Sequence, residues 1–148
     1  RRILRNMDLS ENEIDESIYD AMLLSVDEAH ALHPNKKEKM DITNKPVMGK
    51  GFCIKQACSQ SYATDAQAIA ILCQLCDEKG IPYQRFVNRS DSRGGSTLGS
   101  IAGTLLPVKT VDIGMPILAM HSACELMGVR DMKALSDCVT AFFGYLGK

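Results

Sequence analysis

The segment "MLLSVDEAHALHPN" (22–35) places three metal-capable side chains, Asp27, His30 and His33, behind an apolar run. On a helix, residues i and i+3 share a face but residue i+6 does not, and on a strand residues i and i+3 face opposite sides. The spacing therefore argues against one closed site made by these three alone. Asp27, however, comes where we expect a buried strand (21–26) to end, and open α/β sheets bind ligands beyond the carboxyl ends of their strands. The alternative is that Asp27 caps a turn and both histidines are packing residues. The spacing of these residues does not decide between the two interpretations.

His121 is the second candidate, because it follows "VDIGMPILAM" at another predicted exit from a strand. A lone histidine is more often structural than catalytic. The interest of His121 comes from its pairing with Asp27, since both residues lie just past predicted strands and both could reach one crevice.

Two other motifs have competing interpretations. "RGGST" (93–97) could form an anion-binding nest at a helix N-terminus, although it lacks the pattern of a P-loop or of a dinucleotide fingerprint. Two adjacent glycines more simply indicate a close approach of the backbone to a ligand or a neighbouring segment.

Cys73 and Cys76 form a C-x-x-C pair, but they lie inside a predicted helix on its apolar face, so buried cysteines are favoured over a zinc or redox site.

Composition restricts the class of protein. The 148 residues suit one domain, and a net charge of −1 from 17 basic and 18 acidic residues gives no electrostatic case for nucleic acid or an anionic membrane. No apolar stretch reaches the ~18 residues of a membrane-spanning helix. Six cysteines, most of them in apolar segments, favour a reduced cytoplasmic protein.

The positioning elements alternate between strand and helix. A capping box, "SENE", starts a short helix over 10–20. Strands are expected at 21–26, 51–58, 83–88 and 108–114, helices at 63–80 and 98–106, a polar loop at 35–46, and a helical pattern from Ser122 onward that breaks near Gly128. This alternation predicts an α/β fold with a mostly parallel sheet and flanking helices.

Three segments carry a resemblance to a known family: "SVDEAHALHPN" (25–35), "NRSDSRGGSTLG" (88–99) and "VDIGMPILAMHS" (111–122). Together they resemble the aspartyl aminopeptidases, which are cytoplasmic two-metal exopeptidases. The blocks occur in family order and the similarity runs through nearly all of the chain. The resemblance implies that residues 1–148 are the C-terminal part of the catalytic domain of a metallo-exopeptidase.

The resemblance assigns metal and substrate roles residue by residue. Asp27 matches a terminal ligand of one metal, and His121 matches a terminal ligand of the other. Lys55 matches the lysine that holds the acidic side chain of the substrate's first residue, with Arg93 as the fallback cation. Tyr62 matches a tyrosine that lines the substrate site.

Further positions of the match surround this site. His30 and His33 match histidines that orient ligands or support assembly, and we count His33 among the substrate-binding residues. Gly94, Gly95 and Ser96 of "RGGST" are expected to form part of the substrate-site wall.

The chain also departs from the family pattern. It holds no H-x-D motif and no Glu-Glu pair, which in the family carry the other metal ligands and the general base, and the family's dimerisation insert also lies upstream. Cys124 stands where the family has arginine, which puts in doubt the structure around Glu125 and His121.

Taken together, the resemblance implies a zinc-dependent aminopeptidase with two metal ions, manganese or cobalt being alternatives to zinc. The complete enzyme is expected to be a homo-oligomer that removes N-terminal Asp or Glu from peptides, and the isolated chain is expected to be inactive. The alternative is a stand-alone, non-catalytic domain that has lost the metal centre and serves binding or assembly.

Overall fold

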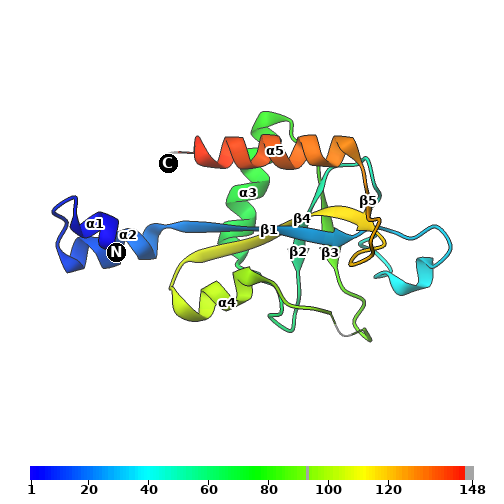
Figure 1. The fold of residues 1–148 in the computed structure, drawn as a ribbon, viewed down its shortest axis with the longest axis horizontal. Coiled ribbons are helices and arrows are strands. Elements are labelled where there is room, and N and C mark those ends of the chain that lie inside the picture. The colour runs from blue at the N-terminus through cyan, green and yellow to red at the C-terminus, as the bar shows by residue number, and fades with distance from the viewer. Residues whose placement is uncertain (93, 146–148) are drawn as a thin grey trace.

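The computed structural model describes residues 1–92 and 94–145, which form an α/β fold around one mixed sheet (Figure 1). In the described part the strand order is β1-β4-β2-β3, and β5 pairs with the carboxyl end of β4. Pairing is parallel in β1/β4 and β2/β3 and antiparallel in β2/β4 and β4/β5. The predicted α/β class, a sheet with flanking helices, is confirmed, and the sheet is mixed where a mostly parallel one was expected.

The elements have the following bounds. The strands are β1 (Met22–His30), β2 (Phe52–Gln56), β3 (Tyr83–Val87), β4 (Lys109–Leu118) and β5 (Leu126–Met127). The helices are α1 (Arg2–Arg5), α2 (Glu11–Asp20), α3 (Ala66–Lys79), α4 (Leu98–Leu105) and α5 (Val129–Phe143), with a single 3-10 turn, η1 (Lys37–Lys39).

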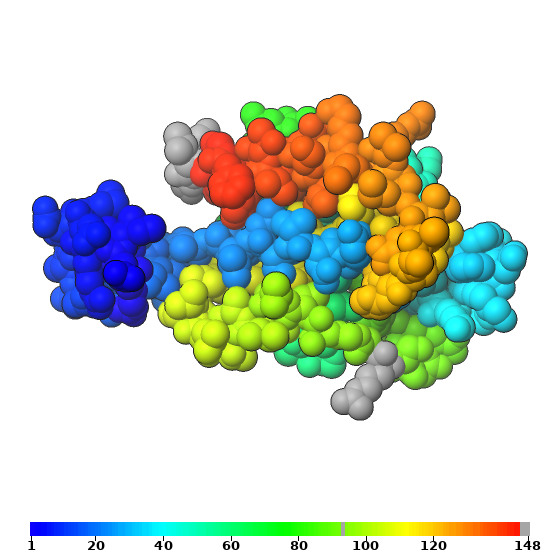
Figure 2. Space-filling model, in the orientation of Figure 1, coloured from blue at the N-terminus to red at the C-terminus, as the bar shows by residue number. Residues whose placement is uncertain are grey.

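Helices cover both faces of the sheet. Helices α3 and α5 lie on one face and α4 on the other, while α1 and α2 project as a separate lobe (Figures 1 and 2). The main core fills the space beneath α3 and α5, and its largest fully buried side chains are Phe52, Ile54, Leu72, Val111 and Ile113. Because side chains alternate along a strand, Cys53 joins a second buried cluster with Ala29, Ala57, Tyr62 and Phe86. This second cluster supports the candidate site.

None of the helices in the described part of the chain combines the length and apolarity needed to cross a bilayer.

The helix starts follow from capping chemistry. At α2, Ser10 Oγ accepts from the Glu13 amide at 3.4 Å, and Glu13 Oε2 accepts from the Ser10 amide at 2.8 Å, so the predicted capping box is confirmed. Helix α3 begins at Ala66, three residues later than predicted, because the Asp65 carboxylate accepts from the Ala68 amide at 2.8 Å and makes Asp65 the N-cap.

Two strands are longer than the apolar runs from which they were predicted. Strand β1 continues to His30 and pairs with β4 over nine positions, and β4 itself continues to Leu118. The prediction that Asp27 follows a strand was wrong: Asp27 lies inside β1, opposite Gly114. Main-chain pairing with a long neighbour extends a strand through polar residues, and apolar content alone does not reveal this.

The helical pattern expected from Ser122 begins only at Val129. Residues 119–125 instead form a turn that leads into β5. The Glu125 carboxylate holds this turn closed by accepting the His121 amide at 2.6 Å. The predicted break near Gly128 is present as the N-cap of α5.

Candidate metal and substrate site

One cavity of about 300 Å³ brings together side chains that are far apart in sequence. Asp27 comes from β1, Lys55 from β2, Tyr62 from the loop after β2, and His121 from the turn after β4. Gly95, Ser96 and His30 line the same cavity. We call it the central cavity.

The Lys55 ammonium occupies the floor of the central cavity. Its Nζ lies 2.7 Å from the Glu28 carbonyl oxygen and 3.3 Å from Asp27 Oδ2, and it stands 4.6 Å from the centroid of the Tyr62 ring. The Lys55 side chain is 4% exposed, whereas the Asp27 side chain is 53% exposed. The ammonium thus uses two of its three donors on Glu28 and Asp27, and one donor remains for a further acceptor in the cavity.

Gly114 makes this reach across the sheet possible. Strand β4 lies between β1 and β2, and Gly114 is paired with both Asp27 and Cys53. A Cβ at Gly114 would come within 2.6–2.8 Å of backbone atoms of Asp27 and Glu28. The absence of a side chain at Gly114 therefore lets the β1 backbone approach β4 near the contact between Lys55 and Asp27.

His121 sits on a strained turn. Ala119 and His121 both have left-handed backbones, with φ of 57° and 68°, which is uncommon for residues other than glycine. Glu125 stabilises the turn through the His121 amide, and the Cys124 amide donates to Ser122 Oγ at 3.1 Å. The Cys124 side chain is exposed, so the turn closes without an arginine at that position. Strain of this kind clusters at functional sites.

Asp112 positions two loops that line the site. It was not identified from the sequence. It is fully buried in β4, and its Oδ2 accepts from the Ala63 amide at 2.5 Å and from Thr97 Oγ1 at 2.7 Å. Ala63 follows Tyr62, and Thr97 follows Ser96, so one carboxylate fixes both loops. A charged residue in the middle of an apolar strand was the available signal.

The charges around the cavity perturb its titratable groups. Burial, followed by the nearby Asp27 and Glu125 carboxylates, raises the pKa of Glu28, and Lys55 partly offsets this. Glu28 Oε2 is buried without a hydrogen-bond partner among the described residues. Burial and the neighbouring Lys55 and His121 lower the pKa of His30.

The glycines of "RGGST" reflect close approach to a neighbouring segment. A Cβ on Gly94 would lie 2.1 Å from Asn88 Nδ2, and that amide in turn donates to the Tyr62 hydroxyl at 3.1 Å. Gly95 borders the open space of the central cavity. Arg93, the fallback cation, lies outside the described residues.

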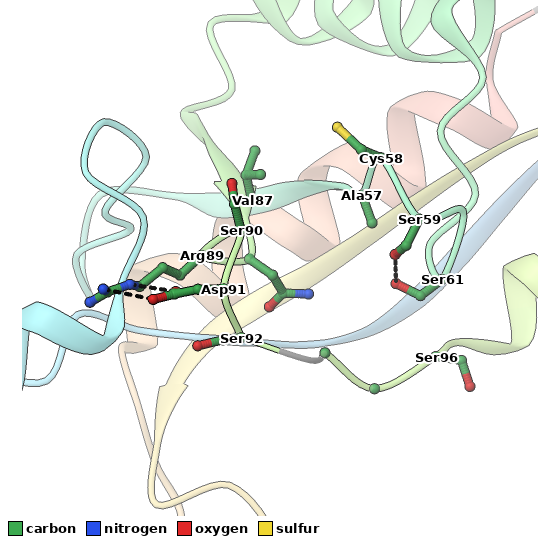
Figure 3. A pocket seen from close by; sticks show the side chains of 13 residues that line it. Ala57, Cys58, Ser59, Ser61, Val87, Arg89, Ser90, Asp91, Ser92 and Ser96 are labelled. Carbon is green, nitrogen blue, oxygen red and sulfur yellow. Dashed lines mark hydrogen bonds and ion pairs between the residues drawn. The ribbon is translucent and has the colours of Figure 1, made fainter.

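Two further cavities adjoin the central one. A cavity of about 810 Å³ is lined by hydroxyl groups and by the Arg89–Asp91 ion pair, as Figure 3 shows; Ser59, Ser61, Ser90, Ser92 and Ser96 provide the hydroxyls. A cavity of about 650 Å³ shares lining residues with both and is bordered by His33 and Gly94. His33 and Gly94 therefore line a neighbouring cavity, whereas the other described residues expected at the site line the central one.

Comparison with known proteins identifies the family. Residues 1–143 match the family model described as aminopeptidase I zinc metalloprotease (M18). This chain belongs to the M18 family of aminopeptidases. It is 47% identical over 130 residues to a probable M18 family aminopeptidase 2 of Clostridium novyi, covering 88% of this chain and 30% of that protein. A protein of the same description from Pseudomonas fluorescens is 41% identical over 143 residues, covering 97% and 32%. The chain thus spans about a third of the length of these curated relatives.

Solved structures share this M18 fold. A chain of the Ape4 and Nbr1 complex superposes with a TM-score of 0.87 at 34% identity, covering 90% of this chain and 26% of that one. An M18 aminopeptidase of Thermotoga maritima gives a TM-score of 0.82 at 22% identity, covering 94% and 32%, and so shows the fold alone.

The zinc of the M18 description can be tested against the side chains of the central cavity. Asp27 offers a half-exposed carboxylate and His121 an imidazole, both of which are donors that zinc accepts. Within residues 1–92 and 94–145, no three His, Cys, Asp or Glu side chains are grouped so that they could hold a metal ion. The residues fit as single contributions to a metal centre and do not form a complete ligand set.

The cysteines do not change this conclusion. All six are free, Cys76 is buried, and its Sγ lies 3.9 Å from Cys138 Sγ between α3 and α5. Cys73 instead lies 3.6 Å from an Arg85 guanidinium nitrogen. Burial raises the pKa of Cys53 to about 12, so this thiol near the central cavity stays protonated.

Proposed function

We propose that this chain is part of a metalloaminopeptidase that removes N-terminal Asp or Glu from peptides. The observation that carries the proposal is the convergence of Asp27, His121 and Lys55 on one cavity in an M18 chain. Family membership supports the class of reaction, and the buried ammonium supports an acidic first residue.

Each side chain has a distinct role in this proposal. Asp27 and His121 would each hold one of two zinc ions, for which manganese or cobalt are alternatives. A bound metal supplies a Lewis acid for the scissile carbonyl and a nucleophilic water. Lys55 binds the carboxylate of the residue to be removed, because an anion entering a closed pocket needs a charged partner.

The remaining residues confine the substrate. The Tyr62 hydroxyl accepts from Asn88, which leaves its own proton available to a substrate oxygen. Gly95 and Ser96 border the opposite wall, where Asp112 holds their loop through Thr97. His33 and Gly94 contact the part of the peptide that extends into the adjoining cavity.

Assembly and location are part of the same proposal. The mApe1 dodecamer of S. cerevesiae, at 25% identity and a TM-score of 0.74 over 84% of this chain and 27% of that one, supports a homo-oligomer. The free cysteines support a cytoplasmic location. The alternative of a non-catalytic binding domain is not favoured by the family match.

The test is a substrate panel on the natural full protein that contains this chain. Aspartyl and glutamyl anilides should be hydrolysed with a higher kcat/KM than alanyl and leucyl anilides. Asp27→Asn and His121→Ala should each lower both activity and bound zinc measured by elemental analysis. Equal or faster hydrolysis of neutral residues would overturn the acidic specificity, and full zinc content in both variants would overturn the ligand assignment.

A further inference from the structure

The 650 Å³ cavity beside the central cavity has a distinct electrostatic character, and we call it the basic pocket. Its nitrogen-bearing cationic or imidazole side chains are Lys36, Lys39, Arg89, His30 and His33. None of the described residues that line it is acidic. A cavity with this lining is suited to an anion.

The basic pocket opens directly from the central cavity. His30, Tyr62, Phe86 and Gly95 line both spaces, so a ligand seated on Lys55 can continue into the basic pocket without leaving the protein surface. A second exit from the central cavity passes Ser96 toward an apolar hollow lined by Leu98 and Ile101. The residue that follows the one removed would therefore meet a basic lining at one exit and an apolar lining at the other.

The cations of the basic pocket differ in how far they are already neutralised. Arg89 is held by Asp91, with Nε 2.6 Å from Oδ1, and it also donates to the Glu38 carbonyl oxygen. Lys36 lies 3.8 Å from Glu38, and both side chains are more than 60% exposed, so this pair is loose. In the described part of the chain no ion pair involves Lys39. The lysines are thus the cations free to bind a ligand.

The segment that carries these lysines is tied to the sheet. The Leu32 amide donates to the Pro46 carbonyl at 2.7 Å and closes the base of the 33–46 loop, which is the cyan segment opposite the α1–α2 lobe in Figure 2. Within the loop, His33 Nδ1 accepts from the Asn35 amide at 3.1 Å. This bond leaves the Nε2 proton of a neutral His33 as a donor. The arrangement therefore presents lysine and imidazole donors from one anchored loop.

We propose that the basic pocket is a second substrate subsite, which binds a carboxylate carried by the residue after the one removed. The proposal rests on the function proposed above, with the first residue on Lys55. The carboxylate has two sources, an acidic side chain at the second position or the free C-terminus of a dipeptide. The preferred substrates are thus peptides that begin with two acidic residues, or acidic dipeptides.

The test compares peptides that differ in a single carboxylate, with the natural full protein at low ionic strength. Asp-Ala-amide provides the reference, Asp-Asp-amide adds the side chain, Asp-Ala adds the C-terminus, and Asp-Leu-amide tests the apolar exit. We expect kcat/KM to rise about 10-fold over the reference for at least one added carboxylate, as a charge-assisted hydrogen bond provides. Whichever arm rises identifies the source.

Matched lysine variants connect the effect to the basic pocket. The double variant Lys36→Met/Lys39→Met should bring the carboxylate advantage close to one. The control is Lys37→Met/Lys45→Met, which removes the same charge from the same loop at residues that line an adjacent hollow and not the basic pocket. This control should keep the advantage. An advantage that both double variants reduce equally would reflect net charge alone and would overturn the subsite.

Other outcomes separate the subsite from the proposed function. Equal rates for the three Asp-Ala and Asp-Asp peptides, with Asp-Ala-amide still preferred over Ala-Ala-amide, would overturn the subsite and leave the proposed function standing. Faster cleavage of Asp-Leu-amide would direct the second residue to the Leu98 hollow and would also overturn it. Failure to cleave any of these peptides would overturn both.

Discussion

The buried ammonium of Lys55 lies 3.3 Å from the exposed carboxylate of Asp27, and this contact links the proposed substrate pocket to the proposed metal ligand. A cation that is 4% exposed needs a compensating charge, and Asp27 supplies it from the open side of the central cavity. The pair therefore aims the Asp27 carboxylate into the cavity while leaving it accessible. A change at either residue affects both functions, so experiments must separate substrate binding from positioning.

Replacing Lys55 tests its role through a ratio of substrates. In the natural full protein, Lys55→Met should lower kcat/KM for an aspartyl anilide about 10- to 100-fold more than for an alanyl anilide, because only the acidic side chain loses a charge-assisted bond. Any loss common to both substrates measures the disturbed Asp27. Lys79→Met, at an exposed lysine that ends α3, is the control. Equal losses on the two substrates would refute the assignment.

Asp112 should be a major determinant of stability. Asp112→Ala removes the acceptor for Ala63 and Thr97 and should lower the free energy of unfolding by about 3 kcal/mol, measured by urea denaturation. Asp112→Asn should cost less, because both bonds reach Oδ2 and an amide oxygen can still accept them. Asp137→Asn removes only an exposed ion pair to Lys133 and should change stability by less than about 0.5 kcal/mol. An alanine variant as stable as the asparagine variant would show that these bonds contribute little.

The fold class was predictable from the sequence because the signals that start and end its helices act over a few residues. The Ser10 capping box and the apolar spacing of α3 each fix an element through contacts within a few residues. The end of β1 was not predictable in this way, because His30 is in a strand only through pairing with Ile117 of β4. The short β5 likewise exists only as a partner of β4.

The candidate site was anticipated only where residue type and position along the chain were informative, and its contacts between distant segments were missed. Asp27 and His121 were linked by residue type and by the expectation of strand exits, and the structure does place both on one cavity. Asp112 was missed because its role depends on amides of two loops that the sheet brings together. The basic character of the neighbouring pocket was missed too, since it arises where the 33–46 loop meets Arg89.

The 148-residue chain by itself should neither hydrolyse acidic aminoacyl anilides nor retain zinc through extensive dialysis. Catalytic zinc normally keeps three protein ligands and a water, whereas Asp27 and His121 are each proposed to hold a different metal. Elemental analysis after dialysis against buffer, with added zinc beforehand, measures retention. Stoichiometric zinc, or efficient turnover with added zinc, manganese or cobalt, would contradict this prediction. Zinc that is lost only in a Cys73→Ala/Cys76→Ala variant would assign it to the cysteines instead.

His30 should make the metal-free chain less stable in mild acid. Its pKa is lowered from the ordinary value of 6.5 because its ring is partly buried and lies near the Lys55 ammonium and His121. Below about pH 6.5 the unfolded chain therefore binds a proton that the folded chain resists, and the free energy of unfolding falls as the pH falls.

His30→Gln removes this linkage, so the decrease in unfolding free energy between about pH 7.5 and about pH 5.5 should become smaller than in the unmodified chain. Urea denaturation at several pH values, with a chelator present, measures the decrease, and His33→Gln controls for the loss of one exposed imidazole from the same segment. The sign is decisive, because a histidine stabilised by a neighbouring carboxylate would instead make the chain more stable as the pH falls. An unchanged or steeper loss of stability in His30→Gln would show that Lys55 and burial do not govern the protonation of this ring.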